Sequence, residues 1–198
     1  MQSAEIRTFV ALRFDAAFLD GLVRQAERVR GALSDRAREL RFVDPGHLHA
    51  TVRFLGSTTD VALGTIATRL ARIAEGTSSF AVETTGVGCF ASRGRVRVVW
   101  LGFEATTRDA SPLDRLHQEV EAAARGAGYE ADTSPFAAHV TLARVRRGRR
   151  VARGNTDVRL EPIRGTCIGI DLLESRLGAA PQARYHTLGA YAFATSAS

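Results

Sequence analysis

Two segments of this chain share a pattern that restricts both their conformation and the surface they present. His49–Val52 and His139–Leu142 each read histidine, apolar residue, threonine, apolar residue, and they lie 139 − 49 = 90 positions apart. Because successive side chains of a β-strand point to opposite faces, each segment is predicted to be a strand with one polar and one apolar face. A helix is predicted before each segment, so the pattern indicates an internal duplication of a β-α-β unit.

The rest of the chain predicts an α+β protein. β-branched and aromatic residues predict strands at 6–14, 47–56, 80–90, 95–103, 135–145, 166–177 and 183–195. Apolar spacing and capping residues predict helices at 19–33, 61–74 and 111–128. Hairpins between the helices favour antiparallel sheets over a parallel wound sheet. No Pro- or Ser-rich linker divides residues 1–198, so we expect a single domain with one motif in each of two lobes, at 49–52 and 139–142.

Composition restricts the class of protein further. Of the 198 residues, 45% are hydrophobic and 24% are charged, which is typical of a globular chain. There is no run of eighteen apolar residues and no pattern of a secretion signal, so we expect no membrane association and a cytoplasmic location. Cys89 and Cys167 lie far apart and lack metal-ligand spacing, which favours two small core residues in a reducing compartment.

The chain has a positive net charge, and arginine is the only residue type that supplies its positive side chains at neutral pH. The formal net charge is +6, and all 27 positive residues are arginine because the sequence contains no lysine. The planar guanidinium suits phosphate recognition, so an RNA-binding surface is one explanation. A GC-rich genome, which favours arginine codons, explains the same composition. The basic segment 146–157, which contains "RRGRRVARG", is predicted to be a loop.

The polar face of the first motif strand carries reactive groups. Strict alternation places His49, Thr51 and Arg53 on one face and the apolar residues on the other, namely Ala50, Val52 and Phe54. A single strand of this kind is more often a solvent-exposed face than a site. The second copy of the motif makes a site the better explanation.

Two such motifs facing each other across a groove predict acid–base chemistry at a phosphate. His49 and His139 can serve as general base and general acid in one displacement, because the pKa of histidine lies near neutral pH. Thr51 and Thr141 can donate hydrogen bonds to the non-bridging oxygens of the phosphate. The sequence offers no carboxylate cluster, so the predicted reaction needs no metal and no cofactor.

The remaining histidines permit one alternative. On a strand spanning 47–56, His47 would share a face with His49 and would provide two ligands for a metal ion. No nearby Asp, Glu or Cys completes such a shell, so His47 is expected to shape the entrance to the first motif. His117 and His186 are expected to have structural or surface roles.

The chain resembles the two-histidine phosphoesterase superfamily, and within it the RNA 2′,3′-cyclic phosphodiesterases, also called 2′-5′ RNA ligases. The resemblance rests on "RTFVAL", "HLHATVRFLG", "RVRVVWLGF", "PFAAHVTLARV" and "LLESRLGAAPQARYHTL". It implies a bilobal α+β fold of duplicated units, in which two antiparallel sheets flank a central cleft and helices cover the outer faces. It also implies metal-independent hydrolysis of 2′,3′-cyclic phosphate ends of RNA or nucleotides to 2′-phosphates, reversible as 2′-5′ ligation.

The resemblance also implies roles for individual residues. His49 would be the general acid and His139 the general base, and the two motif threonines would bind the phosphate. Arg144 matches a basic position that contacts the phosphate in the family, although strict alternation places it on the face opposite His139. Arg53 is the alternative arginine, and Ala138 departs from a proline that the family often has. The expected partners are RNA ends or cyclic nucleotides, and the expected state is a monomer; the alternative function is an RNA- or nucleotide-binding module without turnover.

Overall fold

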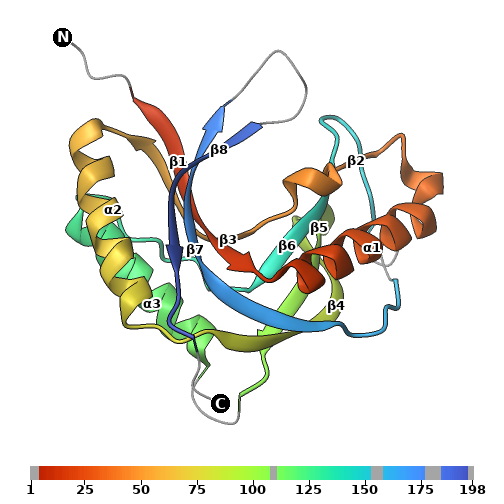
Figure 1. Ribbon diagram of the computed structural model, residues 1–198. Helices are drawn as coiled ribbons and strands as arrows, with labels where there is room; N and C mark the ends of the chain where they lie inside the picture. The colour runs from red at the N-terminus through yellow and green to blue at the C-terminus, as the bar shows by residue number, and fades with distance from the viewer. Residues whose placement is uncertain (1–4, 108–110, 153–157, 177–183, 196–198) are drawn as a thin grey trace.

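Three helices and eight strands make up the described part of the chain. The computed structural model describes residues 5–107, 111–152, 158–176 and 184–195. The strands are β1 (Ile6–Phe14), β2 (Leu40–Phe42), β3 (Ala50–Thr58), β4 (Phe80–Ser92), β5 (Arg95–Ala105), β6 (His139–Val145), β7 (Arg164–Arg176) and β8 (Arg184–Ala192). The helices are α1 (Ala16–Ala32), α2 (Asp60–Glu75) and α3 (Pro112–Gly126), as Figure 1 shows.

The strands pair antiparallel in the order β2-β6-β5-β4-β7-β1-β3, and β8 pairs with Gly169–Arg176 of β7 on the edge opposite β1. The α+β class and the antiparallel pairing are therefore confirmed. The prediction of two separate sheets is not confirmed, because β4 pairs both with β5 and with β7 and so joins the strands into one sheet. Its first residues, Phe80–Glu83, pair with β7, and Val82–Ser92 pair with β5, so hydrogen bonds run continuously through the sheet.

Each helix begins at a capping side chain that the sequence makes recognisable. Asp15, Thr59 and Ser111 accept hydrogen bonds from backbone N–H groups in the first turns of α1, α2 and α3. These bonds satisfy donors that have no partner within a helix. Figure 1 shows α2 and α3 side by side near β3, β7 and β8, and α1 near the other half of the sheet.

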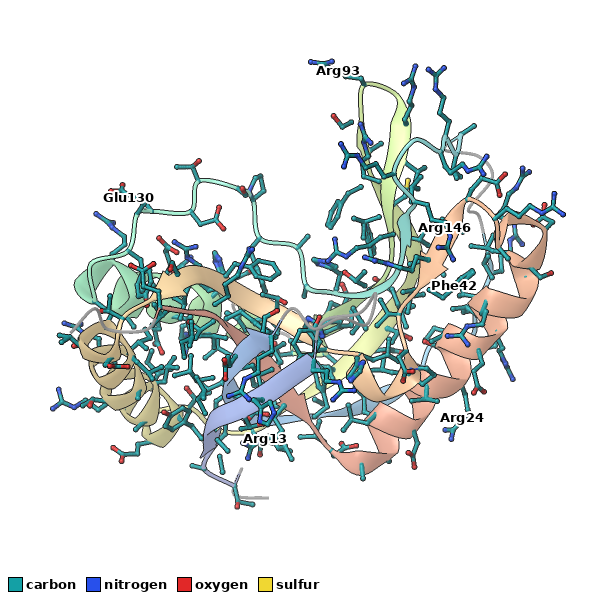
Figure 2. The ribbon with its side chains drawn as sticks, turned by 90° about the horizontal axis from the view of Figure 1, so that it is seen from above. Arg13, Arg24, Phe42, Arg93, Glu130 and Arg146 are labelled. Carbon is teal, nitrogen blue, oxygen red and sulfur yellow. The ribbon has the colours of Figure 1, made fainter. Side chains whose placement is uncertain are left out.

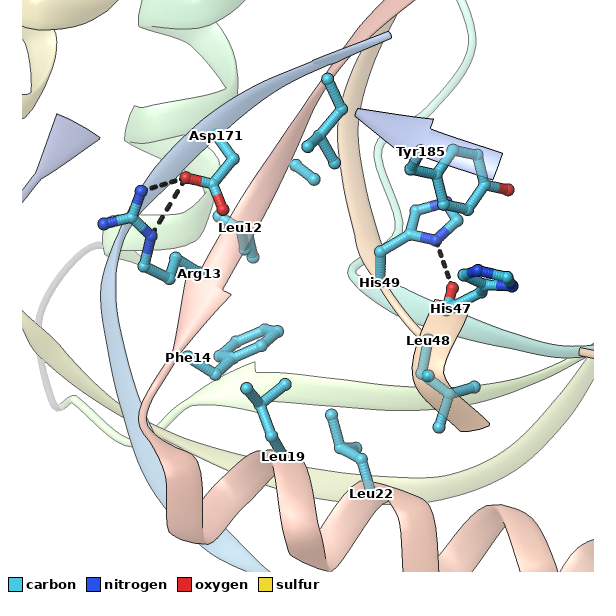
Figure 3. Close-up of a pocket in the computed structure, with 13 residues that line it drawn as sticks. Leu12, Arg13, Phe14, Leu19, Leu22, His47, Leu48, His49, Asp171 and Tyr185 are labelled. Carbon is cyan, nitrogen blue, oxygen red and sulfur yellow. Dashed lines mark hydrogen bonds and ion pairs between the residues drawn. The ribbon is translucent and has the colours of Figure 1, made fainter. Parts of the chain in front are cut away.

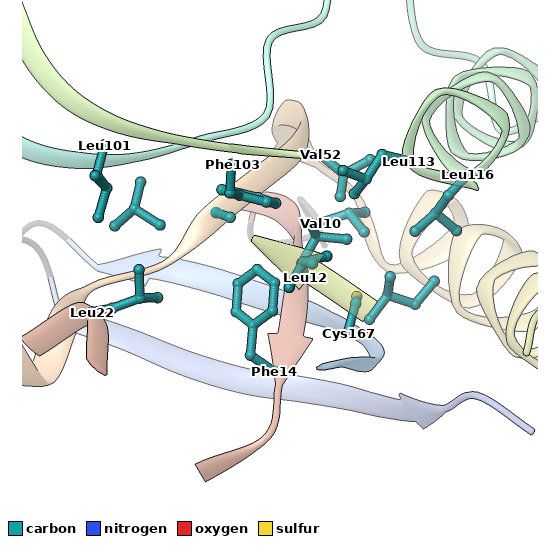
Figure 4. Close-up of a cluster of buried hydrophobic side chains, with 14 of the residues drawn as sticks. Val10, Leu12, Phe14, Leu22, Val52, Leu101, Phe103, Leu113, Leu116 and Cys167 are labelled. Carbon is teal, nitrogen blue, oxygen red and sulfur yellow. The ribbon is translucent and has the colours of Figure 1, made fainter. Parts of the chain in front are cut away.

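One hydrophobic core joins the sheet to the helices. β1 contributes Val10, Leu12 and Phe14, and β5 contributes Leu101 and Phe103, all of them buried. Figure 4 shows these side chains together with Leu22 of α1 and with Leu113 and Leu116 of α3. The burial of this apolar surface stabilises the curvature of the sheet, and that curvature positions the two motif strands.

The beginnings of the motif strands differ from the sequence prediction. Residues 45–47 form a short 3₁₀ turn, because Pro45 fixes the backbone and Asp44 accepts a hydrogen bond from Gly46 N. β3 therefore begins at Ala50, and β6 begins at His139 rather than at 135. The three-residue β2 was not predicted. The predicted turn at 178–182 and residues 153–157 of the basic loop lie outside the described residues.

Candidate active site

The structure brings both sequence motifs together in one cavity. β3 lies at one end of the strand order and β6 lies next to the other end, yet the two strands contact each other. The cavity between them has a volume of about 210 Å³. It is lined by His49, Thr51, Phe54, Phe90, Val98, His139, Thr141 and Arg144.

A one-residue bulge follows the threonine in each motif strand. In β3, Thr51 pairs with Ala11 and Arg53 pairs with Val10, so Val52 is the extra residue. In β6, Thr141 pairs with Trp100 and Ala143 pairs with Val99, so Leu142 is the extra residue. A bulge of this kind reverses the alternation of side chains beyond it. The burial pattern agrees, because in both strands the two residues after the threonine are buried and the third is exposed.

The bulges exchange the expected positions of the two candidate arginines. Arg144 lies on the same side of its strand as His139 and lines the cavity, although strict alternation placed it on the opposite face. Arg53, expected beside His49, instead points away from the cavity. Its Nε lies 2.5 Å from Glu121 Oε2 of α3, and its guanidinium also donates to the carbonyl of Glu130. The prediction that Arg53 shares a face with His49 is therefore wrong. Phe54, predicted on the opposite face, lines the cavity instead.

The two catalytic candidates are held in the same way. His49 Nδ1 donates to the carbonyl of His47 at 2.8 Å, and His139 Nδ1 donates to the carbonyl of Ala137 at 2.6 Å. A carbonyl oxygen only accepts, so Nδ1 must carry the proton in each ring. In the neutral form Nε2 of each imidazole is then an unprotonated acceptor, which is the form that a general base needs.

The environment favours neutral imidazoles in the free protein. Burial is the largest cause that lowers the pKa of His49 and that of His139. The positive charge of Arg144 lowers both pKa values further, while the backbone hydrogen bond of each ring opposes the shift. A bound phosphate would bring a negative charge and would therefore raise both pKa values.

Aromatic rings from distant strands enclose both histidines. Tyr185 of β8 meets His49 edge-on at 4.7 Å between ring centroids, and Phe90 of β4 meets His139 edge-on at 4.9 Å. Trp100 lies 6.1 Å from His139. Sequence reasoning singled out none of these three rings, and it assigned Phe54, which lines the cavity, to the apolar face opposite His49. Their only signal was aromatic content in strands, which predicts core residues equally well.

A second cavity, of about 230 Å³, adjoins the first at His49 (Figure 3). It is lined by His49 and Tyr185 but not by His139 or either motif threonine, and most of its wall is apolar. Figure 3 also shows the hydrogen bond that fixes the His49 ring and the ion pair between Arg13 and Asp171. His47 belongs to the 3₁₀ turn rather than to β3, so the expected shared strand face with His49 is absent.

The other residues considered for function lie outside the cavity. His117 stacks on Phe136 at 4.3 Å, and His186 is exposed on β8. Within residues 5–107, 111–152, 158–176 and 184–195, no three His, Cys, Asp or Glu side chains are grouped closely enough to hold a metal ion. In the same described ranges, no helix has the length and apolar character required to cross a membrane.

Comparison with known proteins identifies the class to which this fold and cavity belong. The profile of the 2′-5′ RNA ligase superfamily matches residues 18–179, and the chain belongs to this superfamily. Its curated relatives include proteins named RNA 2′,3′-cyclic phosphodiesterase. The one from Aeropyrum pernix is 31% identical over 128 residues, which cover 65% of this chain and 70% of that protein. The one from Archaeoglobus fulgidus is 30% identical over 142 residues, which cover 72% of this chain and 74% of that protein.

Solved structures show the same fold. The Thermus thermophilus protein TT0787 superimposes with a TM-score of 0.75 over 97% of this chain and 100% of that chain, at 22% identity. Escherichia coli LigT in complex with 3′-AMP superimposes with a TM-score of 0.66 over 96% of this chain and 99% of that chain, at 23% identity. The architecture described above is therefore that of LigT-like proteins.

Proposed function

We propose that this protein hydrolyses 2′,3′-cyclic phosphate ends of RNA or nucleotides to 2′-phosphates, without a metal ion. One observation carries the proposal: His49 and His139 line one cavity, each with Nδ1 bound to a carbonyl, together with two threonines and Arg144. These groups are the ones that an in-line displacement at phosphorus needs. Curated relatives named RNA 2′,3′-cyclic phosphodiesterase support the choice of substrate.

The proposed reaction follows from the position of each group. His139 Nε2 takes a proton from water, whose oxygen attacks phosphorus while the bond from phosphorus to O3′ breaks on the opposite side. Protonated His49 gives its Nε2 proton to O3′, and a 2′-phosphate remains. The hydroxyls of Thr51 and Thr141 and the guanidinium of Arg144 donate to the non-bridging oxygens, where negative charge accumulates. The choice of His139 as base rests on the family resemblance.

The decisive assay uses an RNA oligonucleotide and a mononucleotide that both end in a 2′,3′-cyclic phosphate. We expect both to yield 2′-phosphates, identified against 2′- and 3′-phosphate standards, at the same rate with and without a chelator. Saturable binding of the RNA without any product would indicate the alternative, a binding module. Loss of activity with the chelator would indicate a metal-dependent reaction.

The pH dependence follows from the lowered pKa values of both histidines. Activity is lost as pH falls through the pKa of His139, because the base must be neutral, and as pH rises through that of His49, because the acid must be protonated. We therefore expect kcat/KM to be bell-shaped with its maximum below about pH 6.5. The kcat profile should lie at higher pH, because bound phosphate favours the imidazolium form. A flat kcat/KM between about pH 5 and about pH 8 would contradict acid–base roles for the histidines.

An activated leaving group separates the two roles. A 3′-deoxynucleoside 2′-(4-nitrophenyl phosphate) has no internal nucleophile and expels nitrophenolate without protonation. We expect His49→Ala to recover most of its activity on this substrate and His139→Ala to remain inactive, as measured by nitrophenolate absorbance. Recovery of the His139 variant alone would reverse the two assignments. Recovery of neither would indicate that the histidines mainly bind the phosphate.

The charge around the cavity favours an RNA chain over a free nucleotide. The segments 86–103 and 134–152 contain eight arginines and no acidic residue: Arg93, Arg95, Arg97, Arg144, Arg146, Arg147, Arg149 and Arg150. Figure 2 shows nitrogen-bearing side chains around the β4–β5 hairpin and the segment after β6, where Arg93 and Arg146 are labelled. Arg41 of β2 pairs directly with Arg144 in the strand register, so it extends this basic surface.

We expect the exposed arginines after β6 to make RNA turnover sensitive to salt. Replacing Arg147, Arg149 and Arg150 by glutamine should lower kcat/KM for a cyclic-phosphate RNA and reduce the slope of log kcat/KM against log salt by about 0.7 per lost phosphate contact. The cyclic mononucleotide is the reference substrate. The matched control replaces three exposed helix arginines, Arg24, Arg28 and Arg72. An unchanged slope in the loop variant would mean that the loop does not contact RNA.

The proposal extends to the organisation of the whole chain. We infer that residues 1–198 form one domain of two related lobes, because the two motif strands share the same bulge, histidine hydrogen bond and burial pattern. The cavity is completed by residues of one chain, which supports a monomer. Two free cysteines, Cys89 and Cys167, are compatible with a reducing, cytoplasmic location.

A further inference from the structure

The second cavity adjoins the two-histidine cavity at His49, on the side where the proposed reaction places the terminal nucleoside. O3′ departs toward His49, and this oxygen stays attached to the ribose that carries the cyclic phosphate. The ribose, and with it the base, therefore lies on the His49 side of phosphorus, while water enters from the side of His139. Figure 3 shows that the second cavity extends from His49 and Tyr185 toward the ion pair of Arg13 and Asp171.

The size and the lining of the second cavity suit a single base. Its volume of about 230 Å³ is smaller than the roughly 300–1,000 Å³ of pockets that hold drug-sized ligands, so it has room for a fragment rather than a whole nucleotide. The leucines Leu19, Leu22, Leu48 and Leu173 line it with apolar side chains that would cover the flat faces of a base. Leu19 is 39% exposed, which leaves apolar surface for a ligand to cover.

A row of paired residues leads from the phosphate-binding threonine to the far wall of the second cavity. Thr51 of β3 pairs with Ala11 of β1, and Ala11 pairs with Asp171 of β7. Directly paired residues of antiparallel strands project from the same face, so these three side chains share one face of the sheet. Neighbouring strands lie about 4.8 Å apart, so the backbones at Thr51 and Asp171 are roughly 10 Å apart. A nucleotide spans a distance of this order from its phosphate to the far edge of its base.

The carboxylate of Asp171 has one oxygen bound to Arg13 and one oxygen available to a ligand. Oδ1 accepts hydrogen bonds from Arg13 Nε at 3.0 Å and from Arg13 Nη2. Oδ2 accepts no hydrogen bond within the described ranges of the chain, and Figure 3 shows it turned away from Arg13. A carboxylate oxygen only accepts, so the edge of a base that meets Oδ2 must present an N–H donor.

We propose that Asp171 selects RNA ends whose terminal base has an amino group at the position shared by adenine N6 and cytosine N4; this inference rests on the hydrolysis proposed above. The amino group donates to Oδ2, while Arg13 fixes the carboxylate through Oδ1. Uracil and hypoxanthine have a carbonyl oxygen at this position. Two acceptors that face each other both lose their hydrogen bonds to water without a replacement, so these bases bind less well.

Two pairs of substrates isolate this edge of the base. The 2′,3′-cyclic phosphates of adenosine and inosine differ only there, and so do those of cytidine and uridine. The measurement is kcat/KM for 2′-phosphate formation from each of the four. We expect adenosine to exceed inosine, and cytidine to exceed uridine, by roughly 5- to 50-fold, because only the amino bases pair with the carboxylate. Each comparison is a ratio within one enzyme, so a change in total activity does not affect it.

Asp171→Asn changes the group that faces the base and keeps the shape of the side chain. The amide oxygen replaces Oδ1 as the acceptor for Arg13, so the amide NH₂ replaces Oδ2 and donates to a carbonyl oxygen. We therefore expect the preference to invert in favour of inosine and uridine. Asp171→Ala has neither group, and its ratios should fall close to one.

Glu174→Gln is the matched control on the same strand. Glu174 is also a carboxylate of β7 that pairs with an arginine, Arg176, but it lines neither the second cavity nor the two-histidine cavity. This variant should keep the ratios of the unmodified protein.

The outcomes separate this inference from the proposed function. Equal kcat/KM within both pairs of substrates in the unmodified protein would overturn the selection by Asp171 while hydrolysis stands. A preference for the amino bases that survives in both Asp171 variants, or that disappears in Glu174→Gln as well, would also overturn it. Absence of 2′-phosphate from all four substrates would instead contradict the proposed hydrolysis itself.

Discussion

Replacing His49 or His139 by alanine is expected to lower kcat/KM for a cyclic-phosphate RNA by roughly 10²- to 10⁴-fold, because each variant lacks one proton-transfer group. The double variant should lose far less than the product of the two single losses, because both groups act in the same step. The measurement is 2′-phosphate formation by each single variant and by the double variant. Near-full activity of either single variant would remove that histidine from the proposed mechanism.

These variants require a control for folding, because both rings contact neighbouring aromatic side chains. His186→Ala removes an exposed imidazole on β8 that does not line the cavity, and it should keep its activity. Thermal unfolding of all variants separates loss of chemistry from loss of structure. A folded His139→Ala protein without activity is the expected result. If the His186 variant lost as much activity as the motif variants, the losses would not report on the cavity.

Arg144→Met is expected to lower kcat/KM by roughly 10²- to 10³-fold, which is the usual effect of removing one donor to transition-state charge. The side chain lines the cavity with both histidines, and its charge lowers both histidine pKa values. The residual activity should therefore have its pH profile displaced to higher pH. A large loss without this displacement would indicate that Arg144 does not act near the imidazoles.

Arg53→Met is the matched comparison, because strict alternation makes Arg53 rather than Arg144 the candidate. Arg53 joins β3 to α3 through Glu121, and both side chains are mostly buried. Removal of one partner of such a pair costs about 3 kcal/mol of stability, since the other charge is left without compensation. We therefore expect a lower Tm but a nearly unchanged kcat/KM in the folded protein. A large loss of activity without a loss of stability would restore Arg53 as a candidate.

The contrast between these arginines shows what the sequence can predict. The His-x-Thr pattern is local and depends only on the two-residue period of a strand, so the placement of His49 with Thr51 and of His139 with Thr141 followed from sequence. The bulges at Val52 and Leu142 depend on how each strand pairs with its neighbour, and the sequence of a single strand does not specify that pairing. Arg53, Phe54 and Arg144, which lie beyond these bulges, were therefore assigned to the wrong faces.

Contacts between distant segments limited the rest of the prediction. The helices followed from apolar spacing, with a capping serine recognised only for α3, and the α+β class followed from the order of the elements. The start of α1 was predicted at 19, whereas the helix begins at Ala16, after the unrecognised cap Asp15. The separation into two sheets was not confirmed, because the pairing of β4 with both β5 and β7 is a long-range property. Phe90 and Tyr185 reach the histidines from strands far away in sequence, so aromatic content in their segments did not distinguish cavity from core.

The bulges also determine which changes in chain length this protein can tolerate. Val52 and Leu142 are buried apolar residues, so exchange for another apolar side chain of similar size should cost little. Deletion of either residue would restore regular pairing and leave the following side chains on their present faces, because the residue removed is the extra one. In β6 Ala143 would then follow Thr141 directly on the core side, and Arg144 would still face the cavity. Among natural relatives that keep this cavity, we therefore expect the arginine either five positions after the second motif histidine (144 − 139 = 5) with the bulge or one position closer without it.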